Sequence, residues 1–172
     1  MSVSVPRGFT LLELMVTITI LAIVAGIGVP SFISTVENNR AQTASNNFFL
    51  SIIQARSEAV KRNQPVVLCK SSDGASCTTS GGWEQGWIAF VSTDATLDAG
   101  EPIFASYSAV SGNTTLRAVN GTDDTLSILS DGTTGFTEVF NICVDNDVDR
   151  GRTIDIAVTG RPSRELGASQ CP

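Results

Sequence analysis

The chain has 172 residues, a formal net charge of −6 and a hydrophobic content of 42%. The length suits one domain, or one domain with an appendage, and the apolar content excludes a disordered chain. Because the chain has no histidine, chemistry that needs imidazole is excluded, such as a Ser-His-Asp triad or His-ligated zinc. The acidic balance argues against general nucleic-acid binding, although a local basic patch is compatible with it.

The most apolar stretch lies near the N-terminus. Residues 14–36 contain no charged side chain, and about 20 apolar residues in a helix cross the hydrocarbon core of a bilayer. Arg7 before the stretch favours a cytoplasmic N-terminus. A secretory signal has small residues after its apolar stretch, whereas Gly8 precedes this one. Glu13 is either an acid that favours the helix macrodipole or a functional charge that needs a partner.

The segment from Arg7 to Glu13, RGFTLLE, resembles the leader and cleavage site of type IV pilins and type II secretion pseudopilins. The resemblance implies that residues 1–8 are a leader, that prepilin peptidase cuts between Gly8 and Phe9, and that the new Phe9 amine is methylated. It also implies that Glu13 meets the N-terminal amine of a neighbouring filament subunit. Pro30 matches the proline where such helices kink or melt, because proline lacks an N–H donor.

The helical pattern continues beyond the span and becomes amphipathic up to Pro65, so that one long helix is predicted over residues 9–64. Its predicted buried face is a stripe at three- and four-residue spacing. The stripe consists of Phe49, Ile52, Ile53, Arg56 and Val60, with Ala44, Phe48, Ala55 and Ala59 nearby.

Beyond Pro65 the apolar period changes to two, and turns rich in glycine and aspartate separate short candidate strands. The strands are predicted at residues 66–69, 86–91, 102–105, 115–119, 126–129, 136–142 and 153–158. Strands that short and that closely spaced indicate antiparallel pairing. The predicted fold class is therefore α+β: a long N-terminal helix, whose first half (about 14–36) spans a membrane, packed on an antiparallel β domain at residues 65–172.

Four segments resemble the GspH/FimT group, which holds the minor pseudopilin H of type II secretion and the FimT- and FimU-type minor pilins. They are residues 53–59, 67–69, 86–90 and 159–161. The resemblance covers nearly the whole chain, is weak between residues 94 and 135, and implies a pilin-like fold.

Four cysteines follow the predicted span, on the side away from the cytoplasm, where the compartment is oxidising and disulfides persist. Three pairings are open. We favour Cys69–Cys77, which closes a turn, and Cys143–Cys171, which pins the C-terminal tail, over other pairings or free thiols. Each bond stabilises the fold by roughly 2–4 kcal/mol.

Two charged clusters lie near the C-terminus. Residues 145–149 have acids at alternate positions, as at the start of an EF-hand loop. However, Arg150 stands where that loop requires glycine, and Ile156 stands where it ends in glutamate. A solvated acidic turn is therefore favoured, and no metal site is expected. Arg150, Arg152, Arg161 and Arg164 form a basic cluster. FimT-type pilins that take up DNA use a Gly-Arg-x-Arg motif, from which Gly160-Arg161-Pro162-Ser163-Arg164 departs by one inserted residue. Pairing of these arginines with the neighbouring aspartates is favoured over DNA binding.

No arrangement of residues predicts a catalytic site or a cofactor. We expect a minor pilin or pseudopilin that waits in the bacterial inner membrane with its β domain in the periplasm. It would then enter a pilus or pseudopilus, at the tip, to prime or cap assembly. The expected partners are other minor and major pilins or pseudopilins, prepilin peptidase, the inner-membrane assembly platform and the membrane. The alternatives are a DNA receptor at a pilus tip and a membrane-anchored periplasmic domain outside any filament.

Overall fold

A computed structural model describes residues 8–92, 94, 98, 101–119 and 124–171, without the side chain of Pro30. The chain divides into two compact units, residues 1–37 and 38–172. The described elements are α1 (Leu11–Arg62), β1 (Val66–Lys70), the short 3-10 helix η1 (Trp83–Gln85), β2 (Gly86–Val91), β3 (Ile103–Ser108), β4 (Thr114–Ala118), β5 (Thr125–Ile128), β6 (Glu138–Val144), β7 (Asp147–Ile156) and β8 (Pro162–Leu166).

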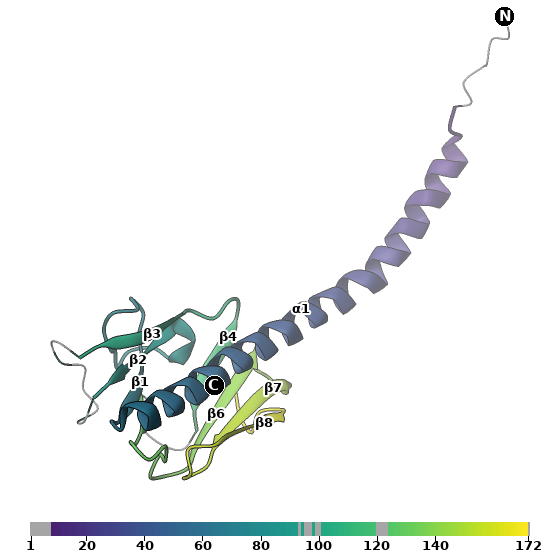
Figure 1. Ribbon diagram of the computed structural model, residues 1–172. Helices are drawn as coiled ribbons and strands as arrows, with labels where there is room; N and C mark the ends of the chain where they lie inside the picture. The colour runs from purple at the N-terminus through teal and green to yellow at the C-terminus, as the bar shows by residue number, and fades with distance from the viewer. Residues whose placement is uncertain (1–7, 93, 95–97, 99–100, 120–123, 172) are drawn as a thin grey trace, which may run out of the picture. The chain divides into compact units, whose positions relative to one another are not determined.

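The strands form two four-stranded sheets, and every pairing is antiparallel, as the sequence predicted. Sheet A has the order β3-β2-β1-β5 and sheet B the order β4-β6-β7-β8. In the second unit, strands of both sheets flank the C-terminal half of α1 (Figure 1). The division into two sheets arises because β4 pairs with β6 and not with β3, its neighbour in sequence.

The core of the second unit lies between α1 and both sheets, and Phe48 is at its centre. The ring of Phe48 is fully buried and meets the rings of Trp83, Trp87 and Phe140 edge-on, with centroids 4.7–5.4 Å apart. Around these rings, apolar side chains of β1, β2 and β5 from one sheet meet those of β4, β6 and β7 from the other. A single cluster therefore ties α1 to both sheets.

The buried face of α1 agrees with the predicted set of residues only in part: Ile52, Phe48 and the three alanines named with them are buried. Ile53 and Val60 are 43% and 53% exposed, and Phe49 is only half-buried. The apolar residues that α1 buries are Ala41, Ala44, Phe48, Ile52, Ala55 and Ala59. Because four of these are alanines, both sheets can approach the helix backbone closely, and the larger apolar side chains of the neighbouring face stay at the surface.

The C-terminal strands are longer and more numerous than predicted. β7 begins at Asp147, six residues before its predicted start, so the acidic run forms the tip of the β6–β7 hairpin. Asp145 and Asn146 occupy that turn with φ of 51° and 59°, a conformation that Asp and Asn tolerate better than other non-glycine residues. β8, which the sequence did not predict, pairs along β7 and carries Arg164.

Candidate functional site

The start of α1 is a capped helix terminus that leaves the predicted cleavage site in non-helical backbone. The N–H of Glu13 donates to Thr10 Oγ1 at 3.2 Å, and the N–H of Leu14 donates to the Thr10 carbonyl at 3.1 Å. Thr10 is therefore the N-cap, and Glu13 lies in the first turn, where a carboxylate favours the helix macrodipole. Gly8 and Phe9 precede the cap and are exposed, and residues 1–7 lie outside the described part of the chain.

The glycine at position 8 is not required by packing within the chain. A Cβ added there would meet no heavy atom within 4 Å, and the same is true of Gly26 and Gly28 in the helix. Any selectivity for glycine at position 8 would therefore come from another molecule that reads this site.

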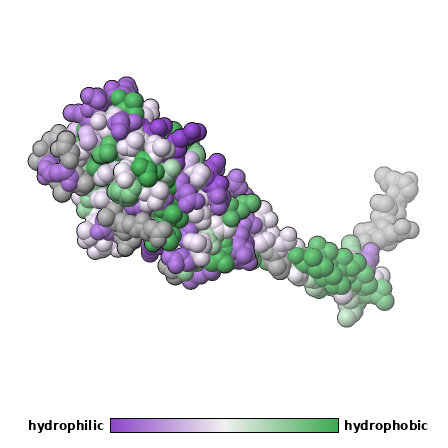
Figure 2. Space-filling view, turned by 90° about the horizontal axis from the view of Figure 1, so that it is seen from below, coloured by the Kyte–Doolittle hydropathy of each residue, from purple (hydrophilic) through white to green (hydrophobic). Residues whose placement is uncertain are grey.

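The N-terminal part of α1 is apolar on every side and almost wholly exposed. None of its most apolar window is buried within the chain, and this one described helix is long and apolar enough to cross a membrane. Figure 2 shows this part of the helix as a nearly continuous apolar surface. Its large apolar side chains, from Leu11 to Ile33, are 49–76% exposed. Such a surface needs lipid or other apolar helices around it.

The helix assignment continues without a break through Pro30. The structure therefore holds this position as helix, where the resemblance implied a kinked or melted segment. A melted segment stays a prediction for the assembled filament.

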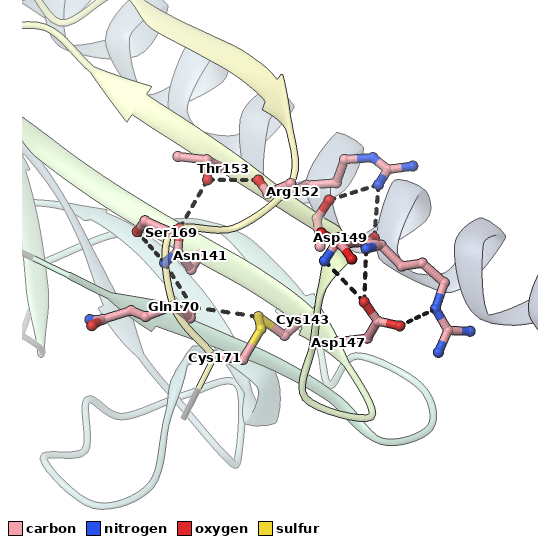
Figure 3. Close-up of a disulfide and its surroundings, with 12 residues drawn as sticks. Asn141, Cys143, Asp147, Asp149, Arg152, Thr153, Ser169, Gln170 and Cys171 are labelled. Carbon is pink, nitrogen blue, oxygen red and sulfur yellow. Dashed lines mark hydrogen bonds and ion pairs between the residues drawn. A yellow bond between two sulfur atoms is a disulfide. The ribbon is translucent and has the colours of Figure 1, made fainter.

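Two disulfides staple the β domain, Cys69–Cys77 and Cys143–Cys171, the pairs that the sequence favoured. The second anchors the C-terminal tail to β6 (Figure 3). Beside it, the Asn141 amide donates to Ser169 Oγ and to the carbonyl of Gln170, both at 2.9 Å. The tail is thus held by a covalent bond and by a polar side chain that is itself buried.

A tight turn fills the Cys69–Cys77 loop. Its centre is Asp73, whose carboxylate accepts hydrogen bonds from the backbone of Ala75 and Ser76 and from the hydroxyls of Ser71 and Ser76. These bonds, of which the one from the Ser76 hydroxyl has the largest effect, hold the pKa of Asp73 well below its usual range.

The four C-terminal arginines do not form one cluster. Arg150 pairs with Asp147 at 2.6 Å, a contact that lowers the pKa of Asp147. Arg152 donates to the carbonyls of Arg150 and Gly151 at 2.8 and 2.7 Å. Arg152 and Arg164 line one hollow, of about 630 Å³, whereas Arg161 lies at the other end of the β7–β8 hairpin.

Arg164 covers an aromatic side chain of the helix. Its guanidinium lies 4.5 Å from the centre of the Phe49 ring and also hydrogen-bonds Asn46. The ring is therefore occupied on the face that the arginine covers.

Arg161 lies near two cationic residues of α1 that the sequence did not assign to any site. Arg161, Arg56 and Lys61 line a hollow of about 940 Å³ whose apolar wall includes Phe49, Ile53 and Val60. Phe49, Ile53, Arg56 and Val60 follow one another at spacings of four, three and four, the signal that they share one side of α1, and Lys61 follows Val60 directly. The same spacing had suggested burial, and only the tertiary structure shows an open groove.

The acidic tip shows no sign of a metal centre. Among the residues that the structure describes, no three His, Cys, Asp or Glu side chains come together in a way that could hold a metal ion. Asp147 is held by Arg150, and Asp145 accepts a hydrogen bond from Asn113 at 2.9 Å.

Comparisons with known proteins agree with this geometry. The family model described as Type II transport protein GspH matches residues 44–160, and that of the prokaryotic N-terminal methylation motif matches residues 5–29. No match was found among curated proteins.

Two crystal structures of the type IV minor pilin FimU from Pseudomonas aeruginosa (strain PAO1) have a similar fold. Each is 21% identical to this chain; their TM-scores are 0.66 and 0.57, and they cover 79% and 76% of this chain and 98% and 99% of their own. The fold is therefore that of a pilin. Together with the family match over most of the β domain, these observations show that the chain belongs to the GspH family of minor pilins and pseudopilins.

Proposed function

We propose that this protein is a minor subunit that primes or caps the assembly of a type IV pilus or a type II secretion pseudopilus. The observation that carries the proposal is the apolar, exposed N-terminal part of α1, which begins at Leu11, shortly after the Gly8–Phe9 bond. A surface of this kind is stable in the inner membrane before assembly and among the helices of other subunits afterwards. The assembly platform would move the subunit from the first environment to the second.

Processing at Gly8 is the first step of this proposal. Prepilin peptidase would cut the Gly8–Phe9 bond in the exposed backbone ahead of the Thr10 cap, and methylation would follow on the Phe9 amine. Since no described atom lies within 4 Å of a Cβ added at Gly8, a larger residue there would leave the fold intact and block only the peptidase.

The test is co-expression of the full chain with prepilin peptidase, followed by intact-mass measurement. We expect the wild-type chain to lose residues 1–8 and to gain one methyl group on Phe9. The variant Gly8→Leu should keep its full mass. Gly28→Leu is the matched control, because a Cβ there is equally unhindered, and it should be processed normally. A wild-type chain with the same mass with and without peptidase would refute the proposal.

Glu13 would act in assembly and not in processing. It is the only charged residue in the apolar part of α1, and a carboxylate surrounded by apolar helices needs a cationic partner. The methylated amine of Phe9 on a neighbouring subunit would supply it. Glu13→Gln should therefore be cleaved normally but should fail to enter filaments, measured by its absence from sheared filament fractions.

Priming or capping has its own test. Deletion of this chain should lower the number of filaments per cell without changing the amount of major subunit in the membrane, and tip labelling should place this chain at filament ends. Unchanged filament numbers, or uniform labelling along filaments, would contradict the role at the tip.

No structural observation favours DNA binding, the alternative function. Arg150 is paired with Asp147, Arg152 donates to backbone carbonyls, and Arg164 covers Phe49. The three guanidinium groups thus already have partners, and the chain carries a net charge of −6.

A further inference from the structure

A small hollow between α1 and the connection from β3 to β4 is the strongest unassigned feature of the second unit. We call it the Arg40 hollow, and its volume is about 140 Å³. The side chains in its wall that can donate a hydrogen bond are Arg40, Thr43, Asn47, Trp87, Ser108 and Ser111. Among the described residues no aspartate or glutamate lines it, although the chain carries a net charge of −6. The hollow therefore suits a negatively charged group that accepts hydrogen bonds.

Trp87 is the buried donor of the Arg40 hollow. Its side chain is 1% exposed, and its ring stacks on Tyr107 and meets Phe48 edge-on. The indole Nε1 is buried as well, and it has no acceptor among the residues that the structure describes. An indole N–H can only donate, and a buried donor without an acceptor is destabilising. The packing that fixes the ring thus leaves one donor for a group from outside the chain.

Arg40 supplies the positive charge of the hollow. Its side chain is exposed, and it has no hydrogen-bonded or ionic partner among the described residues. A Cβ built at Gly112 would lie 2.8 Å from Arg40 Nη1, so the guanidinium group lies against the turn between β3 and β4. A guanidinium group binds phosphate oxygens through two parallel N–H donors. Arg40 is therefore placed at the hollow with its donors unoccupied.

The place of Arg40 in the chain indicates where its ligand comes from. Residues 14–36 are the uncharged span, and Arg40 follows its last residue by four positions, at most about 14 Å of chain. The headgroup layer next to the hydrocarbon core is about 5–8 Å thick, and arginine side chains near the end of a span extend into it. Lipid phosphates are therefore the anions closest to Arg40 while α1 is in a membrane.

We propose that the Arg40 hollow binds the phosphodiester group of an anionic membrane lipid, with Arg40 at the phosphate oxygens and Trp87 Nε1 donating to one of them. The inference rests on the proposed anchoring of α1 in the inner membrane and adds a lipid contact to it. The contact holds the β domain at the membrane surface before assembly, and it is lost when the subunit leaves the bilayer.

Size and charge favour a lipid headgroup over a segment of another protein. A hollow of about 140 Å³ takes one phosphate group, far less than the contact area of a stable protein interface. A lipid does not need that area, because headgroups surround an anchored helix at high local concentration. A zwitterionic headgroup would bring its own cation beside Arg40, where the hollow has no acid to receive it. An anionic headgroup avoids this repulsion.

The test follows the indole N–H signals of the full chain in maltoside micelles by NMR, because the only two tryptophans are Trp83 and Trp87. Trp87→Phe assigns the signals by removing one of them. Dioctanoyl phosphatidylglycerol should shift the Trp87 signal in a saturable way and leave the Trp83 signal in place. Dioctanoylglycerol, which lacks the phosphate, should shift neither. Arg40→Gln should weaken the affinity for the phospholipid by about tenfold, because it removes the charged donor.

Lys61→Gln is the matched control: it removes one positive charge from the same helix at an exposed position outside the Arg40 hollow. It should keep the wild-type affinity, and an unshifted Trp83 signal checks that both variants fold. An unmoved Trp87 signal would overturn the inference, as would equal affinities of wild type and Arg40→Gln or an equal loss in Lys61→Gln.

Free anions provide the last comparison. Inorganic phosphate and acetate, at the phospholipid concentration that gives half of the full shift, should move the Trp87 signal much less, because they do not concentrate in the micelle. Equal shifts would show a site for any small anion and would overturn the lipid assignment. None of these results affects processing at Gly8, so failure here is distinguishable from failure of the proposed function.

Discussion

Phe48 offers the most direct test of how α1 holds the β domain together. Its ring is fully buried and meets three aromatic rings edge-on, those of Trp83, Trp87 and Phe140. Phe48→Ala removes all three contacts and leaves a cavity where α1 and both sheets meet. Substitutions of this kind cost about 3–5 kcal/mol, and each lost edge-on pair contributes about 0.5–1.5 kcal/mol beyond the buried area. We therefore expect a loss near the upper end, about 4–5 kcal/mol.

Tryptophan fluorescence can follow this unfolding, because the chain has only two tryptophans and both contact Phe48. The full chain in detergent would be unfolded by denaturant, and the emission of Trp83 and Trp87 would report the β domain alone. With about 3–4 °C per kcal/mol for a domain of this size, the melting temperature should fall by about 15 °C.

Leu50→Ala is the matched control for Phe48→Ala. Leu50 lies two residues away on the same helix and is 59% exposed, so its loss should change the free energy of unfolding by less than about 0.5 kcal/mol. If Phe48→Ala costs no more than Leu50→Ala, or less than about 1 kcal/mol, the proposed packing of α1 against both sheets is wrong.

Three further predictions concern the β domain. Removing the Cys143–Cys171 bond by serine substitution should lower the free energy of unfolding by about 3.5 kcal/mol, and removing Cys69–Cys77 should lower it by about 2.5 kcal/mol. The difference arises because the two bonds join residues 28 and 8 positions apart. Comparable denaturation midpoints for the two variants would contradict this expectation. Gly160→Ala should destabilise the fold more than Gly135→Ala. Both residues have positive φ, but of the two only Gly160 has a neighbouring carbonyl, that of Gly132, that an added Cβ would crowd, so equal melting temperatures would disprove the crowding. Asp73, Asp131 and Asp147 have pKa values in the folded protein that lie below the ordinary aspartate value of about 4. Because the unfolded chain therefore binds protons first, the free energy of unfolding should fall as the pH drops below about 4, and should go on falling until the folded-state carboxylates are protonated. A flat melting temperature from pH 6 to pH 2 would contradict the last expectation.

The features that the sequence alone predicted depend on residues close together in the chain. Gly8, Phe9 and Glu13 form a contiguous motif, and the absence of charge over residues 14–36 predicts an apolar helix without any knowledge of packing. Most strands were found within a few residues, since alternation and turn residues are local signals. The Cys69–Cys77 pair also spans one short turn.

The features that the sequence missed depend on contacts between distant segments. Both faces of α1 carry apolar residues at helical spacing, and only the approach of two sheets to the alanine-rich face decided that Phe48 is buried while Ile53 and Val60 are exposed. β8 has exposed, charged residues and no alternation of burial, so its pairing with β7 leaves no local pattern.

Contacts between distant segments also explain why Arg161 and Arg164 line different hollows. In sequence Arg161 belongs with Arg164, three residues away, but hydrogen bonding between β7 and β8 and the turn before β8 place it beside Arg56 and Lys61 of α1. The sequence by itself therefore predicted an anchored, processed, pilin-like subunit. The tertiary structure decided that Arg161 shares a hollow with Arg56 and Lys61, because that hollow is assembled from residues about one hundred positions apart.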